Sequence, residues 1–582
     1  MPAPRHRQPP PQAAAYERWM DFASDPTKPA DQRVQAAMNA GDLTAPRAPI
    51  KAIEAYRLAA SIDPLDGSPA IAAATLIARR GDWKAARIEA GQAFRTSLDE
   101  VVRADAAFLL GEVALACEQL DEAQDAFAAA AQLFERVHAR DRQDPAPLNA
   151  IARLHMRQAD MALNGGNHDS AEDHAARAAA ILDGLQTQFP KDPKIMADAR
   201  ACLDRQIDLA MARNDAPAAA AWLDRLLPLA LAAHADAPDD QSVQRNLGLV
   251  RLKHSLVRER LHDSDAALES ADAAIGLLAD LAAKDRDAAV LGQDLGRAMR
   301  RRADIALSRG EASLAAAIAF QAGELFEQWL RKDPDAVSLM RDRAGAAVLE
   351  GDAAMQVRAY DQARQAFTRA RDLCIKGMSL EPNATTWQPA LATAFDRIGD
   401  AVLHNNEARA AAEAYAESLN VRSRLPDQQA LATLQARAIT AAKLADAASR
   451  ADLPRQARVA AHTALRARQA IATARPEDLA ARDAHARALQ RFGVAALAIG
   501  EHDDARMALE DSLALLQHCP VWEDKAPESR RRRAKLWADL ASLGEDDAAH
   551  FAAQALTLLE SLIAQNTAEG QDIALRNRLL KL

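Results

Sequence analysis

The stretch GDAAMQVRAYDQARQAFTRA, residues 351–370, contains the pattern that decides the fold. The same spacing returns in GEVALACEQLDEAQDAFAAA, residues 111–130, and in GDAVLHNNEARAAAEAYAES, residues 399–418. Each stretch begins with glycine and has an alanine twelve residues later, an aromatic residue four beyond that and a small residue three further on. Positions 0, 4 and 7, counted from the alanine, lie on one face of an α-helix. The pattern therefore predicts a helix whose small residues allow a partner helix to pack closely.

The alanine of this pattern recurs with a period of 48 residues. It occupies positions 123, 171, 219, 267, 315, 363 and 411, and the series continues less regularly at 457, 505 and 549. Breaks such as Asp333-Pro334 fall at the same period, and turn residues such as Gly310-Glu311 lie midway between them. Because proline suits the first turn of a helix and is excluded from its interior, each repeat is predicted to be two helices of about 20 residues joined by a tight turn. Roughly twelve such hairpins fit into the chain.

The spacing of Gly351, Ala363, Phe367 and Ala370 resembles the signature of the tetratricopeptide repeat family, whose ordinary repeat has about 34 residues. The period of 48 is similar to that of a longer bacterial variant. The resemblance covers about residues 30–560 and implies an all-α fold, a right-handed solenoid in which each hairpin contacts its neighbours. It also implies that the concave groove of the solenoid binds protein or peptide ligands.

Four parts are expected along the chain. Residues 1–15 are rich in proline and predict a disordered leader. Residues 16–98 predict shorter hairpins that turn at Gly41-Asp42 and Gly81-Asp82. The array with the 48-residue period is assigned to residues 99–526, and a last hairpin with a capping helix to residues 527–582.

The composition favours closely packed helices. Of the 582 residues 49% are apolar but only 4% are aromatic, and alanine, the best helix former, dominates. The four cysteines lie far apart, which predicts reduced, buried core residues and not a disulfide framework. The sequence has neither an apolar stretch long enough to cross a membrane nor a signal peptide, so a cytoplasmic protein without a membrane partner is expected.

The charge argues against a dedicated nucleic-acid binder. The formal net charge is −10, whereas such proteins normally carry a basic excess. The run Arg530-Arg531-Arg532-Arg533 is the exception, and a solvated helix face accounts for it. A solenoid that binds nucleic acid through this run is a weaker alternative.

The sequence gives no indication of catalysis. It contains no phosphate-binding loop, no zinc-protease motif, no hydrolase nucleophile motif and no kinase motifs. The closest approach to a metal site is His168-Asp169 followed by His174, which an ordinary polar helix start explains. A non-enzyme without cofactor or metal is expected.

Two polar columns recur on the first helix of the repeats, and the resemblance places both in the groove. The cation column is followed three residues later by a carboxylate column. Members of the two columns are Arg157 and Asp160, Arg205 and Asp208, Arg301 and Asp304, Arg397 and Asp400, and Lys443 and Asp446, with Asp352 in the carboxylate column alone. One interpretation is a ligand-binding groove. The other is a structural ladder, in which these charges pair with each other within and between repeats and hold the phase of the solenoid.

The central repeats depart from the ladder. Lys253 has Leu256 in the place of its carboxylate, and Arg297 and Arg300 add cations beside Arg301. This cluster predicts a basic patch with more cations than acids, suited to an acidic segment of a partner, although a solvated face explains the same charges.

The predicted helix that contains Lys253 also carries an apolar stripe. Leu249, Leu252 and Leu256 lie nearly opposite its main apolar face. They predict either an apolar anchor in the groove or contacts with neighbouring repeats.

The expected function is therefore that of a non-catalytic scaffold which binds a protein or peptide through its concave groove. The alternative is a sensor or regulatory subunit of a bacterial signalling or defence system. Its effector would be a protease, a kinase or a nucleotide-binding enzyme on a separate chain.

Overall fold

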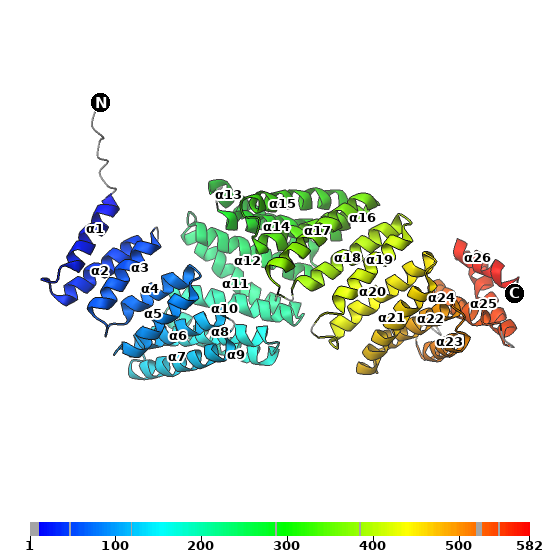
Figure 1. Ribbon diagram of the computed structural model, residues 1–582, viewed down its shortest axis with the longest axis horizontal. Coiled ribbons are helices and arrows are strands. Elements are labelled where there is room, and N and C mark those ends of the chain that lie inside the picture. The colour runs from blue at the N-terminus through cyan, green and yellow to red at the C-terminus, as the bar shows by residue number, and fades with distance from the viewer. Residues whose placement is uncertain are drawn as a thin grey trace, which may run out of the picture. The chain divides into compact units, whose positions relative to one another are not determined.

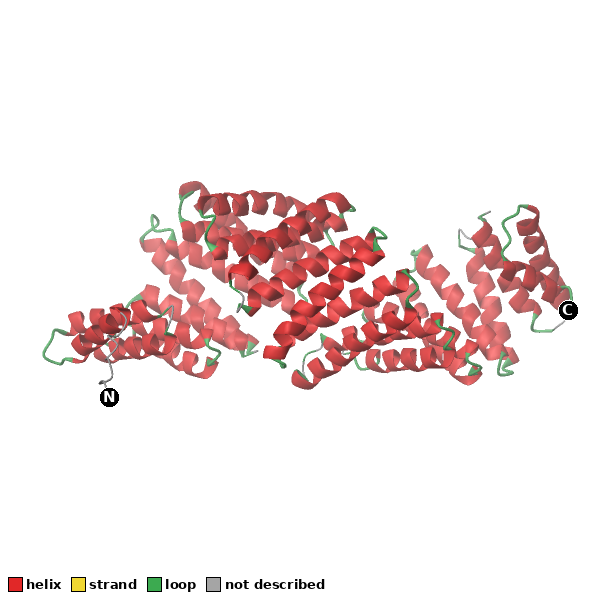
Figure 2. Ribbon diagram, turned by 90° about the horizontal axis from the view of Figure 1, so that it is seen from above, coloured by secondary structure: helices red, strands yellow, loops and turns green. Residues whose placement is uncertain are grey.

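The computed structural model describes residues 11–581 except 46–47, 118, 286–287, 383, 385, 426, 520–525 and 545–546. Over these residues the chain is an all-α solenoid without strands, as predicted, and Figure 2 shows helices joined by short loops. Residues 1–10 of the expected leader lie outside the described part. Its last five residues do not form an extended segment, because α1 (Pro11–Ser24) begins at Pro11. Proline there occupies the first helical position, which its fixed φ favours, and alanines follow.

The chain divides into two compact units, Met1–Pro238 and Asp239–Leu582. The boundary falls at Pro238-Asp239, one of the breaks between repeats. The further helices of the first unit are α2 (Ala30–Thr44), α3 (Pro49–Ile62), α4 (Ser68–Arg79), α5 (Trp83–Thr96), α6 (Glu100–Ala116), α7 (Leu120–Arg140), α8 (Ala146–Asn164), α9 (His168–Gln188), α10 (Pro193–Ala212) and α11 (Ala216–Asp236).

The second unit contains fifteen helices in its described part. They are α12 (Gln241–Arg260), α13 (Ser264–Lys284), α14 (Ala289–Ser308), α15 (Ala312–Lys332), α16 (Val337–Gln356), α17 (Tyr360–Leu380), α18 (Trp387–His404), α19 (Ala408–Arg422), α20 (Leu431–Arg450), α21 (Pro454–Ala474), α22 (Leu479–Leu497), α23 (His502–Gln517), α24 (Pro527–Ala541), α25 (Ala548–Ala564) and α26 (Gly570–Leu579).

These helices form twelve antiparallel hairpins, from α2–α3 to α24–α25, in the described part of the chain. Consecutive hairpins of a unit lie side by side in Figure 1, and the first helix of one hairpin also contacts the first helix of the next, as α12, α14 and α16 do. Helix α1 packs on α2, and α26 packs on α25 as the expected capping helix. The first helices of a unit therefore form a continuous surface on which a groove can be built.

Most of the described turns within hairpins follow one design. The first helix ends with a residue in the left-handed conformation, such as Gly310 (φ 79°) or Asn406 (φ 63°). The next residue donates a hydrogen bond to a carbonyl five residues back, as Glu311 does to Ala306 (2.8 Å). This is a Schellman C-cap, and it satisfies carbonyl groups that the helix end would leave unpaired.

Gly41-Asp42 is not a turn, contrary to the prediction. Both residues lie inside α2, and a Cβ atom at Gly41 would come within 2.3 Å of the Tyr56 ring. The Tyr56 hydroxyl donates a hydrogen bond to Asp42 (2.7 Å). This glycine is therefore equivalent to the glycine of the repeat signature and not to its turn.

Close packing explains that signature. A Cβ atom at Gly351 would come within 2.3 Å of the Phe367 ring, and one at Gly111 within 2.4 Å of the Phe127 ring. Both aromatic side chains are fully buried. The glycine thus lets the aromatic ring of the second helix lie directly on the backbone of the first.

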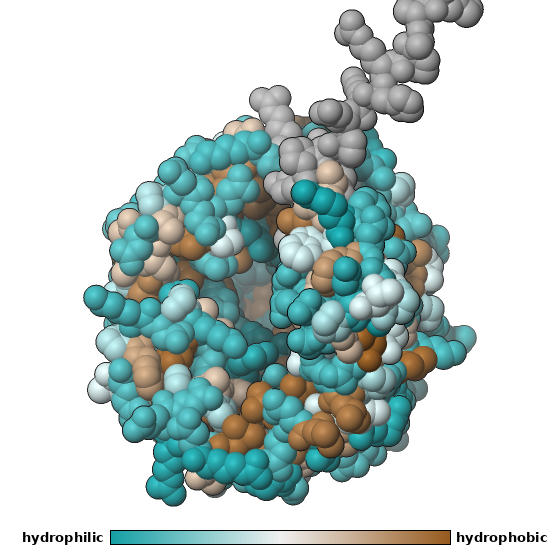
Figure 3. Space-filling model, turned by 90° about the vertical axis from the view of Figure 1, so that its left-hand side faces the viewer, coloured by the Kyte–Doolittle hydropathy of each residue, from teal (hydrophilic) through white to brown (hydrophobic). Residues whose placement is uncertain are grey.

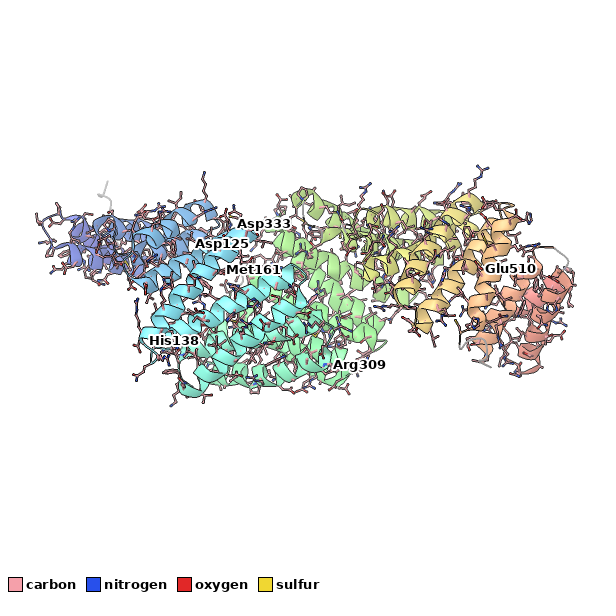
Figure 4. The ribbon with its side chains drawn as sticks, turned by 90° about the horizontal axis from the view of Figure 1, so that it is seen from below. Asp125, His138, Met161, Arg309, Asp333 and Glu510 are labelled. Atoms are coloured by element: carbon pink, nitrogen blue, oxygen red, sulfur yellow. The ribbon has the colours of Figure 1, made fainter. Side chains whose placement is uncertain are left out.

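The second helices expose both polar and apolar side chains, among the latter Phe320 on α15 and Val459 on α21. Asp125 on α7 and Glu510 on α23, labelled in Figure 4, are exposed. The face drawn in Figure 3 is mostly hydrophilic, with apolar side chains in scattered patches. No helix in the described ranges combines the length and apolar character needed to cross a lipid bilayer.

Three of the four cysteines are buried, as predicted, but Cys117 is exposed. Cys117 is the C-cap residue of α6, where the chain leaves the core to turn. Its position at a helix end, and not its residue type, decides its exposure.

Candidate functional site

A cavity of about 790 Å³ lies in the second unit, and we call it the central cavity. It is lined by the first helices α12, α14, α16 and α18, with α17 contributing Ala370 and Cys374. Burial raises the pKa of the Cys374 thiol to about 11, so the thiol stays protonated at neutral pH. The volume of the central cavity is within the range of ligand pockets.

Most of the predicted groove residues meet in this cavity. Those that line it are Leu252, Lys253, Leu256, Arg297, Arg300 and Arg301. Leu249 is half-buried but does not line the cavity. The opposite wall comes from residues that the sequence pattern did not single out, among them Arg341, Val348 and Trp387.

The apolar part of the cavity lies where leucine interrupts the polar columns. Leu256 replaces a carboxylate on α12 and is 37% exposed, and Leu349 replaces a cation on α16 and is half-buried. Leu252 packs against the apolar cluster between α13 and α14. The indole of Trp387 is buried beneath the guanidinium of Arg341, 5.0 Å from the ring centroid, and donates a hydrogen bond to Glu381 (3.0 Å).

Arg297 and Arg300 are not the unbalanced cations that the sequence suggests. Both bind the buried carboxylate of Asp342 on α16, Arg297 at 2.7 Å and Arg300 at 3.4 Å. Burial lowers the pKa of Arg300. A Cβ atom at Gly345 would come within 2.5 Å of the Arg300 guanidinium, so that side chain lies across the backbone of α16. Arg297 also lies 3.8 Å from Asp294 on its own helix. The two arginines share Asp342 and connect α14 to α16.

Arg301 belongs to the ladder and not to an open patch. It is 8% exposed and binds Glu259 (2.7 Å) and Asp304 (3.0 Å), and it donates to the carbonyl of Ser255 (3.1 Å). Lys253 lines the cavity and is likewise not an isolated cation. Arg297, Arg300 and Arg301 are neutralised mostly by acids of neighbouring repeats, Asp342 and Glu259.

The ladder pairs charges between repeats. The cation of one repeat contacts the carboxylate of the preceding one. Such pairs are Arg157 with Glu112 (2.7 Å), Arg205 with Asp160 (2.7 Å), Arg397 with Asp352 (3.1 Å), Lys443 with Asp400 (2.7 Å) and Arg491 with Asp446 (2.9 Å). Contacts within a repeat are longer, as between Arg157 and Asp160 (3.4 Å). The geometry therefore favours the structural interpretation of the ladder.

Asp304 marks the place where the ladder is broken. The next repeat offers it Leu349 instead of a cation, so its one ion-pair partner among the described residues is Arg301. Burial and the nearby Glu259 raise the pKa of Asp304 above its usual value. The cavity thus opens at a point where the repeat-to-repeat pairing fails.

The C-terminal arginine run is not a solvated face. Arg530 donates to Gln565 (2.6 Å), Arg531 binds Asp572 (2.9 Å) on α26, and Arg532 binds Asp483 on α22. These arginines connect α24 to its neighbours, and their charge is engaged within the protein.

Compared with models of known protein families and with curated proteins, the chain matches none. Among solved structures, the apo form of RapI is 9% identical, with a TM-score of 0.42, over 74% of this chain and 97% of that one. Yeast Tom70 is 14% identical, with a TM-score of 0.30, over 95% of each chain. The Rap protein complexed with Competence and Sporulation Factor is 11% identical, with a TM-score of 0.35, over 72% of this chain and 99% of that one. At these identities and TM-scores no property of these proteins carries over to this chain.

Proposed function

We propose that the protein is a non-catalytic, cytoplasmic scaffold that binds a protein partner in the central cavity. The observation that carries the proposal is the coincidence of an open apolar surface with a basic rim at the break in the ladder. Leu256 and Leu349 lie beside Lys253, Arg300 and Arg341 on the cavity wall. Arg300 already contacts Asp342 and Arg341 contacts Glu381 (3.5 Å), so an acid of the partner would add to these contacts. One apolar side chain of a partner would pack on the leucines, and an adjacent acidic residue would bind the rim.

We also propose that the repeats belong to a long-period bacterial variant of the tetratricopeptide repeat family. The regulatory-subunit alternative requires the same groove and differs in its partner, which would be an enzyme on another chain. The identity of the captured partner separates the two.

The test uses a substitution that does not disturb Asp342. Leu256→Glu places a negative charge at an exposed position of the cavity and should repel an acidic partner. Leu314→Glu on α15 is the matched control, since Leu314 is similarly exposed (42%) and does not line the cavity. Surface changes of this kind usually alter stability by no more than about 0.5 kcal/mol.

We expect a partner captured by the wild-type protein from cell extract, and identified by mass spectrometry, to be lost with Leu256→Glu and kept with Leu314→Glu. Direct titration of the purified partner should show the same order, with weaker binding at higher salt. Equal binding by all three proteins would exclude the central cavity as the docking site.

A further inference from the structure

A second cavity of the same unit, of about 370 Å³, lies between α20, α21 and α22, and we call it the C-terminal pocket. Its floor consists of small apolar residues, including Ala438, Ala442 and Ala484. Its charged lining is Lys443, Asp446, Arg468, Arg487 and Arg491. Four cations thus face one carboxylate across a pocket of small-molecule size.

This pocket occupies the same place in its repeat as half of the central cavity. Its lining residues follow those of the central cavity by 94 residues. The equivalent pairs are Gly345 and Ile439, Val348 and Ala442, Leu349 and Lys443, Ala370 and Ala464, Cys374 and Arg468, Ala390 and Ala484, and Thr393 and Arg487. The change from Cys374 to Arg468 matters most, because a buried thiol position is replaced by a guanidinium.

Arg468 differs from the other cations of the pocket in its surroundings. Lys443 binds Asp400, Arg487 binds Asp483 and Arg491 binds Asp446. Arg468 is half-buried on α21, and no carboxylate lies within ion-pair distance of it in the described part of the chain. Burial lowers the pKa of Arg468, and the positive charges of Arg487 and Arg491 lower it further.

The neighbouring acids do not remove the excess of charge. Asp483 is shared between Arg487 and Arg532, and Asp400 is shared between Lys443 and Arg397. A partly buried cation without a counter-ion is unfavourable, and a bound anion would relieve the cost.

From this geometry we infer that the C-terminal pocket binds the phosphate group of a small phosphomonoester. Arg468, Arg487 and Arg491 approach from two helices, α21 and α22, and guanidinium groups bind phosphate oxygens through paired hydrogen bonds. A phosphate presents three oxygens and up to two negative charges, which suits three arginines better than a carboxylate with two oxygens and one charge does. The alanine floor provides an apolar surface for the organic part of the ligand.

The test is isothermal titration of the full-length protein with phenyl phosphate, inorganic phosphate and benzoate at constant ionic strength. We expect saturable binding of phenyl phosphate and binding of benzoate at least tenfold weaker. If inorganic phosphate binds as tightly as phenyl phosphate, free phosphate is the source of the anion. If it binds more weakly, an organic phosphate is.

Arg468→Gln is the decisive variant, and Arg466→Gln is its control, because Arg466 is exposed on the same helix and does not line the pocket. We expect Arg468→Gln to weaken phenyl phosphate binding at least tenfold and Arg466→Gln to leave it unchanged. Since Arg468→Gln removes a charge without a counter-ion, its Tm without ligand should equal or exceed that of the wild type, which excludes misfolding as the cause of lost binding.

Absence of saturable binding to the wild type, equal binding by Arg468→Gln, or benzoate binding as tight as that of phenyl phosphate would each overturn the proposal. The Leu256→Glu variant of the central cavity should bind phenyl phosphate normally. The two proposed sites therefore succeed or fail independently.

Discussion

The central cavity and the C-terminal pocket are built on the same positions of two repeats and differ in their side chains. Where the central cavity has Leu349 and Cys374, the C-terminal pocket has Lys443 and Arg468. Helices α20, α21 and α22 of the C-terminal pocket correspond to α16, α17 and α18 of the central cavity, which also includes α12 and α14. The comparison shows that the signature residues set the fold, whereas a few columns on the inner face set the binding chemistry.

The two places also differ in how they neutralise arginine. In the central cavity, Arg297 and Arg300 share Asp342, whose side chain is 8% exposed. In the C-terminal pocket, Arg491 pairs with Asp446, whose side chain is 51% exposed. The arginines themselves are similarly exposed, with side chains of Arg297, Arg300 and Arg491 at 40%, 33% and 34%. The difference lies in the carboxylate, which is buried between α14 and α16 in the central cavity and open to solvent in the C-terminal pocket.

Removal of the carboxylates of Asp342 and Asp446 should give the largest difference in stability between the two sites. Asp342→Asn leaves Arg300 without an ion-pair partner among the described residues and Arg297 with Asp294 alone, at 3.8 Å, and should lower the free energy of unfolding by about 3 kcal/mol. Asp446→Asn breaks a pair that is largely exposed and should cost less than about 1 kcal/mol. Urea denaturation followed by circular dichroism measures both, and equal losses would contradict the distinction.

Substitution of alanine for a tightly packed glycine in the first helix of a hairpin at each site should lower stability by less than Asp342→Asn does. A Cβ atom at Gly296 would come within 2.5 Å of the Phe326 ring, and one at Gly493 within 2.7 Å of Leu509 Cγ. We expect Gly296→Ala to destabilise the protein by about 2 kcal/mol and Gly493→Ala by about 1 kcal/mol, because a rigid ring yields less than a leucine.

Gly276→Ala on α13 is the control for these two variants. No atom lies within 4 Å of the new methyl group, so the substitution should raise stability by up to about 1 kcal/mol through helix propensity. A loss of stability at Gly276 would show that glycine in these helices has a role other than close packing.

The sequence predicts features that depend on residues within one hairpin better than features that depend on contacts between repeats. The period located the hairpins, and the position of turns such as Gly310-Glu311 is confirmed by their backbone conformation. Gly41 was assigned to a turn because glycine serves both turns and close packing, and only the contact with Tyr56 distinguishes them.

The neutralisation of the basic patch by acids of other repeats could not be predicted from the spacing within one hairpin. Its carboxylate, Asp342, lies 45 residues after Arg297, and pairing across repeats depends on how the helices stack. The spacing of the ladder pairs, such as Arg205 with Asp160, is the signal that identifies such partners once one structure is known.

Equivalent turns below the two sites should show a modest effect. Arg358 (φ 60°) and Asp452 (φ 57°) both adopt the left-handed conformation. Arg358→Gly should stabilise the protein by about 0.5 kcal/mol, because the left-handed strain exceeds the entropy that glycine loses on folding. Asp452→Gly should gain less, since aspartate adopts this conformation more readily. Thermal denaturation compares the two, and a larger gain at Asp452 would contradict the explanation.

An effect of similar, small size tests why the central cavity exists. Leu349→Arg would restore the cation column, and the new arginine would stand 45 residues after Asp304, the spacing at which Arg397 pairs with Asp352. In the wild type the raised pKa of Asp304 means that its ionisation opposes folding, an effect that grows as pH rises from about 4 through the folded-state pKa. The new pair should relieve this effect, so the variant should gain about 0.5 kcal/mol at neutral pH. The gain should vanish at low pH, where Asp304 is protonated in both the folded and the unfolded state. Melting temperatures of both proteins between pH 3 and pH 8 measure the difference. If the difference in melting temperature between the two proteins stays constant across this range, Leu349 does not interrupt the ladder.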